Sequence, residues 1–272
     1  MTIAEIRGKI SHSGQNLSER MEDLLTSDIF GCIRYLPTQN ALIPFLQTAR
    51  SLHGNIFTIP GKVLRAHWSF WPWLKLADRI PCEPDVIVGL ETKENHVHLI
   101  LIEAKYYSGL SSEEDEREEP NNQLARELDN LDAVSAATLG WNPQLDIASR
   151  RLLFITQHMG MPRDLLARSL AEYTRKRNRN GDISWASWRF LPSILEKSLE
   201  CETISERIAV LKDMLNLLDK KGLVTFQGIE PVIHRFDLPS FYHFIKKGYE
   251  WPHIPEAIYI DYLYRRCHNE RS

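Results

Sequence analysis

One strand of this chain runs from an apolar interior directly into two charges, and this feature constrains the fold more than any other. The segment at 98–106 reads HLILIEAKY, in which four apolar residues are followed by Glu103 and Lys105. Side chains two residues apart on a strand project from the same face of a sheet. Burying a charge without a partner costs free energy, so we expect both charges to find partners at the end of this strand.

A second strand is expected at 84–91, PDVIVGLE, because this segment is rich in β-branched residues. The residues between the two strands are typical of a turn. If the turn is centred on Glu94, the two strands form an antiparallel hairpin in which Asp85 lies opposite Glu103. Two facing carboxylates repel each other unless a positive group lies between them. Hard divalent cations such as magnesium bind carboxylate oxygens, so the hairpin predicts a metal site at its open end.

The rest of the chain alternates amphipathic helical segments with short apolar strands, and it shows no internal repeat. Helices are expected at 17–25, around 40–53, and at 121–138, 161–177, 192–199 and 204–222, with further strands at 151–158 and 182–191. This order predicts an α/β fold in which helices flank a mixed β-sheet. We expect a core over 1–200 and a mainly helical extension over 201–272 that packs on it, or a single domain.

Composition excludes several classes of protein. The net charge of −3 rules out a globally basic coat for nucleic acid, so any such binding would use local patches. No apolar run approaches the length of a membrane span, and the first residues lack the apolar core of a secretory signal. The four cysteines, at 32, 82, 201 and 267, are scattered and form no metal-binding pair. We therefore expect a cytoplasmic protein with no membrane association.

The pair Pro84-Asp85, followed by Glu103-Ala104-Lys105 on the next strand, resembles the PD-(D/E)XK nuclease superfamily. The surrounding segments are similar as well, because an acidic helix lies upstream and a glutamine, Gln123, lies in the helix that follows. The resemblance covers roughly residues 17–200. It implies a restriction-endonuclease-like fold with a helical C-terminal extension.

The resemblance also implies a function, the hydrolysis of phosphodiester bonds in nucleic acid with Mg²⁺ or Mn²⁺. Asp85 and Glu103 would hold the metal with the Ala104 carbonyl, and Glu22 would join them from the upstream helix. Lys105 would orient the attacking water, and Gln123 would steady the site. Asp23 is the rival of Glu22, because an error of one residue in the helix phase exchanges the two.

Alternatives remain open at this point. The chain could be a catalytically silent relative that binds nucleic acid or a protein partner, or a nuclease that acts on RNA. DNA is favoured over RNA because most relatives act on it. A homodimer, or a partner protein in a defence, repair or mobile-element system, is compatible with the sequence. The structural alternative for Glu103 and Lys105 is an exposed ion pair on one face of a strand, which contributes little to stability, but the flanking apolar run and Pro84-Asp85 argue against it.

Two further groups of residues have both a functional and a structural interpretation. A basic segment could grip phosphates or could form a solvated helix face; its cations are Arg163, Arg168, Arg175, Lys176, Arg177 and Arg179. The tryptophans at 68, 71 and 73 could stack on unpaired bases, but such clusters more often pack in a core. We interpret His96 and His98 as residues of the turn and the acidic run at 111–119 as a solvated loop.

Overall fold

The computed structural model describes residues 17–92, 96–106 and 122–224, with side chains from Met21 onward. The chain divides into two compact units, residues 1–225 and 226–272, and the description that follows concerns the first. Residues 1–16, the acidic run at 111–119 and the C-terminal part of the expected extension lie outside the described residues.

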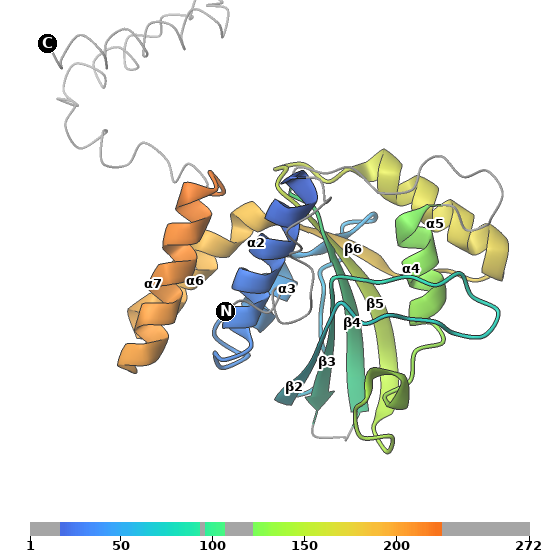
Figure 1. Ribbon diagram of the computed structural model, residues 1–272, viewed down its shortest axis with the longest axis horizontal. Helices are drawn as coiled ribbons and strands as arrows, with labels where there is room; N and C mark the ends of the chain where they lie inside the picture. Colours follow the sequence, from blue (N-terminus) through green and yellow to red (C-terminus); the bar gives the residue numbers. More distant parts are fainter. Residues whose placement is uncertain (1–16, 93–95, 107–121, 225–272) are drawn as a thin grey trace, which may run out of the picture. The chain divides into compact units, whose positions relative to one another are not determined.

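A six-stranded mixed β-sheet forms the centre of the described unit (Figure 1), in the order β1-β6-β5-β4-β3-β2. The strands β2, β3 and β4 are antiparallel neighbours, β4, β5 and β6 run parallel, and β1 is antiparallel to β6. The strands are β1 (Arg50–Ser51), β2 (Val63–Phe70), β3 (Val86–Thr92), β4 (His96–Ala104), β5 (Asp146–Thr156) and β6 (Ile183–Ser187). The predicted α/β fold with a mixed sheet flanked by helices is confirmed.

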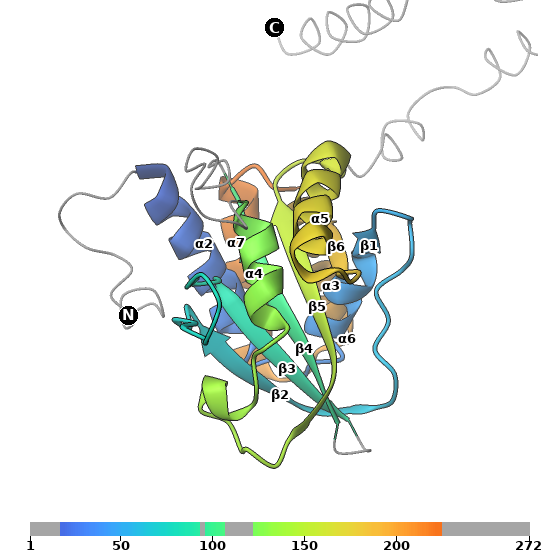
Figure 2. The same ribbon diagram turned by 90° about the vertical axis from the view of Figure 1, so that its right-hand side faces the viewer.

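Helices cover both faces of this sheet. The helices α2 (Leu17–Ile33), α3 (Leu42–Thr48), α6 (Leu191–Cys201) and α7 (Ser205–Lys220) pack on one face, and α4 (Gln123–Leu131) and α5 (Arg163–Arg177) pack on the other. Figure 2 shows α4 and α5 in front of the sheet. Strand β4 serves both cores, because Ile100 and Ile102 face the first group of helices and Leu99 and Leu101 face the second.

The hairpin of β3 and β4 has the register that a turn centred on residue 94 predicts. Val86 lies opposite Ile102 and Ile87 lies opposite Leu101. Continuing this register by one residue beyond the end of β3 brings Asp85 level with Glu103. A slip of one residue would turn the buried side chains of a strand to the other face, so the two apolar cores hold this register firmly.

Several element boundaries differ from the sequence-based expectations. Helix α2 continues eight residues past Leu25 to Ile33, because Ile29, Phe30 and Ile33 extend its buried stripe. Helix α4 ends at Leu131 instead of 138, and residues 137–139 form a separate 3₁₀ turn. Strand β6 ends at Ser187, whose hydroxyl accepts a hydrogen bond from the backbone N–H of Arg189 and starts a second 3₁₀ turn over residues 188–190.

The beginning of the expected C-terminal extension is part of the main core. Helix α7 buries Leu211, Met214 and Leu218 in the same apolar cluster as Phe30 of α2. The compact unit that contains α7 extends to residue 225. Residues 201–224 therefore help to build the layer that carries α2.

Candidate functional site

The candidate site lies where β4 ends. Glu103 is the next-to-last residue of β4, and its side chain is 2% exposed. It follows Leu99 and Leu101 in the alternation of the strand, so it points to the face that α4 covers. After Ala104 the chain leaves the strand, and the backbone N–H of Lys105 donates a 2.7 Å hydrogen bond to the carbonyl of Ile155. The end of β4 is thereby held against β5.

Lys105 joins two carboxylates that come from different elements. Its Nζ lies 2.8 Å from Glu103 Oε1 and 3.0 Å from Glu22 Oε1 on α2. Burial by itself disfavours the charged ammonium, but Glu103, Asp85 and Glu22 outweigh this effect and raise the pKa of Lys105 above its ordinary value. The neighbouring carboxylates therefore favour the charged form of Lys105.

Asp85 lies against the backbone of β4. Its Oδ2 accepts a 2.8 Å hydrogen bond from the N–H of Ala104, and its Oδ1 accepts one of 3.2 Å from the indole of Trp71. Burial, and then the neighbouring charge of Glu103, raise the pKa of Asp85 well above its ordinary range. The predicted pair Asp85 and Glu103 is thus brought to one end of the hairpin.

Glu22 is the acidic residue of α2 that contacts this group. Its Oε2 accepts a 3.0 Å hydrogen bond from the backbone N–H of Tyr106, and its Oε1 pairs with Lys105. The side chain is 6% exposed, whereas its predicted rival Asp23 is only partly buried. Helix α2 therefore turns Glu22 toward the end of β4.

Gln123 connects the site to α4. It is the first residue of this helix, which Asn122 caps by accepting a hydrogen bond from the N–H of Ala125. The amide Nε2 of Gln123 donates to Glu103 Oε1 at 2.6 Å and to Glu127 Oε1 at 3.0 Å. Glu22, Lys105, Glu103 and Gln123 are therefore joined by direct side-chain contacts, and Asp85 lies beside them against the backbone of Ala104.

Glu127 is a member of this network that the sequence analysis missed. It is 1% exposed, and burial followed by the charge of Glu103 raises its pKa well above the ordinary value. The sequence does contain a signal for Glu127. It follows Gln123 by four residues, and residues four apart share a helix face. That spacing is informative only once α4 is known to lie over Glu103.

The site contains more negative than positive charge. Glu22, Asp85, Glu103 and Glu127 are all buried, and the ammonium group of Lys105 pairs with two of them, Glu22 and Glu103. The second oxygens of Glu103 and Glu127, both Oε2, are buried without a hydrogen-bond partner. Buried acceptors of this kind are uncommon, and a hard cation is a chemically suitable partner for them.

The side chains alone do not complete a metal site. Within residues 17–92, 96–106 and 122–224, no group of three or more His, Cys, Asp or Glu side chains is arranged so that it could hold a metal ion. A cation at Asp85 and Glu103 would therefore need a backbone carbonyl and water as further ligands. This requirement is compatible with magnesium, which usually keeps several water ligands.

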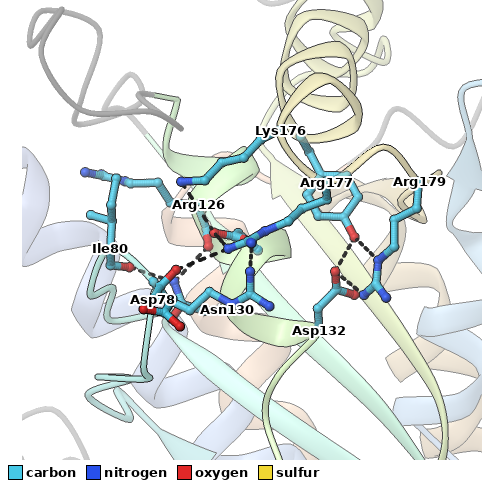
Figure 3. Close-up of polar contacts among 11 residues, drawn as sticks. Asp78, Ile80, Arg126, Asn130, Asp132, Lys176, Arg177 and Arg179 are labelled. Atoms are coloured by element: carbon cyan, nitrogen blue, oxygen red, sulfur yellow. Dashed lines mark hydrogen bonds and ion pairs between the residues drawn. The ribbon is translucent and has the colours of Figure 1, made fainter.

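The predicted phosphate-binding cations mostly have partners within the protein. Arg177 and Lys176 pair with Asp129 of α4, which Arg79 also binds at 2.6 Å (Figure 3). Arg179 pairs with Asp132, and Arg163 donates to the carbonyl of Leu52. Arg168 and Arg175 are exposed on α5. The contacts of Lys176, Arg177 and Arg179 hold α5 against α4.

Of the histidines and tryptophans considered in the sequence, Trp71 contacts a residue of the site. His96 pairs with Asp146 and His98 contacts Ser149 at the beginning of β4, the opposite end of the strand from Glu103. Trp68 stacks on Phe70 next to the main core. Trp71 contacts Asp85, and Trp73 is 63% exposed.

Comparison of the chain with protein-family models, with curated proteins and with solved structures finds no match. Among the described helices, none combines the length and the apolar character needed to cross a membrane.

Proposed function

We propose that this protein is a metal-dependent nuclease that hydrolyses phosphodiester bonds of nucleic acid, with DNA as the favoured substrate. The observation that carries the proposal is the cluster at the end of β4, where Lys105 contacts Glu103 and Glu22 while Asp85 accepts a hydrogen bond from Ala104. This combination on a hairpin within a mixed sheet resembles the PD-(D/E)XK superfamily and its restriction-endonuclease-like fold. The free thiols of Cys32, Cys82 and Cys201 support a cytoplasmic location.

The metal in this proposal is Mg²⁺ or Mn²⁺. Asp85 and Glu103 would hold it with the Ala104 carbonyl, and Glu22 would approach from α2. The excess of buried carboxylates and the unpartnered Oε2 of Glu103 support a cation at this place. When bound, such an ion polarises the phosphate and lowers the pKa of a coordinated water.

The protein's own groups would do the rest of the chemistry. Lys105, kept charged by its carboxylate neighbours, would orient the attacking water and stabilise the negative charge that develops on the phosphate. Gln123 holds Glu103 in place through its 2.6 Å hydrogen bond. The hydrogen bonds from Ala104 and Trp71 fix the orientation of Asp85.

A cleavage assay tests the proposal. Purified protein is incubated with plasmid, linear duplex, single-stranded DNA and RNA in Mg²⁺, in Mn²⁺ and in EDTA. We expect metal-dependent cleavage, and a loss of about 10²-fold or more in Lys105→Ala and Asp85→Asn, the scale of removing a charge-stabilising group. Lys212→Ala removes an exposed lysine of α7 and is the matched control.

The same assay separates the alternatives. Cleavage that persists in both site variants would reject the mechanism. Cleavage of RNA alone would identify an RNA nuclease. If the parent protein cuts none of the substrates, the catalytically silent interpretation gains support, and binding of the same substrates then becomes the relevant measurement.

A further inference from the structure

The segment from Trp71 to Asp85 connects β2 to β3 and is anchored along its length. The backbone N–H of Trp71 donates to the carbonyl of Asp85 at 2.9 Å, and Leu74 and Cys82 exchange two backbone hydrogen bonds. Further along, Asn130 of α4 donates to the carbonyl of Ile80 at 2.7 Å. Figures 1 and 3 show the segment passing beside α4. These hydrogen bonds fix the position of the segment from Trp71 to Asp85.

Trp71, the first residue of this segment, has an unusual backbone conformation. Its φ of 44° lies in the left-handed region, which a bulky residue rarely adopts. Strain of this kind persists where the surroundings hold the residue, and it gathers at functional sites. The backbone and indole of Trp71 both donate to Asp85, and its ring is buried. These contacts explain how the strained conformation is maintained.

Trp73 follows this left-handed residue by two positions. It lies between two anchored residues, Trp71 and Leu74, and yet 63% of its side chain is exposed. Two residues of chain span at most about 7 Å, so the backbone of Trp73 is about one nucleotide's length from the residue that binds Asp85. A large aromatic surface is thus presented to solvent at the edge of the site by a segment that backbone hydrogen bonds hold on both sides of it.

An indole ring in this place has a specific partner in a nucleic acid. Aromatic side chains stack on unpaired bases, and each such contact is worth about 1–3 kcal/mol. Inside a duplex the faces of the bases are already stacked on one another, and separating them costs a few kcal/mol per step, so an unpaired base or a frayed end is the favoured partner of a protein ring. We infer that Trp73 is a stacking platform for an unpaired base beside Asp85, and that the site takes single strands or frayed duplex ends. The substrate class inferred in this way rests on the proposed nuclease function.

Binding to defined oligonucleotides tests the inference. The affinity of full-length protein for a labelled single-stranded oligodeoxynucleotide and for a fully paired duplex whose ends are clamped by runs of G·C pairs is measured by fluorescence anisotropy, in Ca²⁺ and in EDTA. We expect the parent to prefer the single strand. Trp73→Ala should weaken single-strand binding about tenfold and leave duplex binding unchanged, whereas Trp73→Phe, which keeps an aromatic face, should stay within about threefold of the parent.

An exposed aromatic residue away from the site serves as the matched control for Trp73. Tyr35 is an aromatic residue with 68% exposure that lies two residues past Ile33, the last residue of α2, and Ile33 is eleven residues along the helix from Glu22. Tyr35→Ala should bind both oligonucleotides as the parent does. Because Trp73 is exposed, Trp73→Ala should also unfold at the same temperature as the parent, which separates a binding effect from a folding effect.

Several outcomes would overturn the inference. They are a parent that does not bind the single strand or prefers the duplex, and a Trp73→Ala variant that binds single strands as tightly as the parent or loses both ligands equally. Its failure is distinguishable from failure of the nuclease proposal. Metal-dependent cleavage with no effect of Trp73 would reject the stacking platform alone, whereas Trp73-dependent binding without any cleavage would reject the nuclease alone.

Discussion

At the scale of single residues, the site is defined by an imbalance of charge. Glu22, Asp85, Glu103 and Glu127 are buried close to one another, and the ammonium group of Lys105 pairs with Glu22 and Glu103. Carboxylates in such a place either take up protons or bind a cation, because the interior does not solvate several like charges. The raised pKa values of Asp85 and Glu127 have this cause.

Binding of a divalent cation should therefore stabilise the folded protein. In about 10 mM MgCl₂ we expect the unfolding temperature of the parent to rise by several degrees relative to EDTA at equal ionic strength, because a ligand that binds only the folded state stabilises it by mass action. Glu103→Gln should lose this increase. Asp164→Asn, which changes an exposed carboxylate of α5, should retain it. An increase of equal size in Glu103→Gln would place the cation elsewhere.

The raised pKa of Glu127 leads to a prediction about pH. A carboxyl whose pKa is higher in the folded than in the unfolded state stabilises the protein below its unfolded pKa, and this contribution is lost as the pH rises through the folded pKa. Glu127→Gln should therefore stabilise the metal-free protein at pH 7.5, by about 1 kcal/mol or more, which is the scale of one pKa unit. The gain should shrink toward pH 4.5.

Urea unfolding in EDTA at the two pH values measures this difference. Glu202→Gln is the comparison, because Glu202 lies outside the site and its pKa is lowered by backbone hydrogen bonds from Ile204 and Thr203. A variant of Glu127 that is less stable than the parent at both pH values would contradict the prediction. It would mean that the hydrogen bond from Gln123 outweighs the cost of the buried charge.

At the scale of elements, Asp129 fastens three parts of the chain together. It is a fully buried carboxylate of α4 that pairs with Arg79 of the segment between β2 and β3, and with Lys176 and Arg177 of α5 (Figure 3). Asp129 lies two residues after Glu127 on the same helix. These ion pairs therefore help to set the position of the helix that carries Gln123 and Glu127.

Burial raises the pKa of Asp129, as it does that of Glu127, but Asp129 differs because Arg79, Lys176 and Arg177 pair with it. Asp129→Asn should therefore destabilise the protein by about 3 kcal/mol, because removing one partner of a buried ion pair leaves the other charges uncompensated. The matched control is Asp146→Asn. Asp146 pairs with His96 on the surface, where both side chains are largely exposed, and its loss should cost under about 1 kcal/mol. Chemical denaturation of the three proteins measures both values, and equal stability of the two variants would show that Asp129 is no anchor.

At the scale of the whole molecule, the layer that carries Glu22 depends on residues far along the chain. Helix α7 packs in the same apolar cluster as α2, and the hydroxyl of Tyr106, next to Lys105, donates to the carbonyl of Lys221 just after α7. The compact unit that contains the site ends at residue 225.

Two truncations test this boundary. A chain that ends after residue 225 should unfold cooperatively, within a few degrees of the full-length protein. A chain that ends after Cys201 loses the buried Leu211, Met214 and Leu218, each worth about 1.5–3 kcal/mol, a sum comparable to the whole stability of a typical domain. It should show no cooperative transition. Circular dichroism on heating distinguishes the two, and cooperative unfolding of the shorter chain would place the boundary near residue 200.

Much of the site can be predicted from the local pattern of apolar and charged residues. The apolar runs at 84–91 and 98–102 demand one register, because a one-residue slip would expose a buried face, and that register carries Asp85 and Glu103 to the same end of one hairpin. Lys105 then follows from the two-residue period of a strand. Gln123 and Glu22 came from the resemblance to a nuclease superfamily.

Other features depend on contacts between distant parts of the chain, and no local period encodes them. Glu127 joins the site only because α4 lies over the face of β4 that Glu103 shares with Leu99 and Leu101. A run of cations has the same sequence whether its side chains are solvated or paired. Arg177 pairs with Asp129, which lies forty-eight residues earlier in the chain. The left-handed conformation of Trp71 is accompanied by two hydrogen bonds that Asp85, fourteen residues later, accepts from it. Periodicity determines which face a side chain takes, whereas packing between layers determines which charges meet.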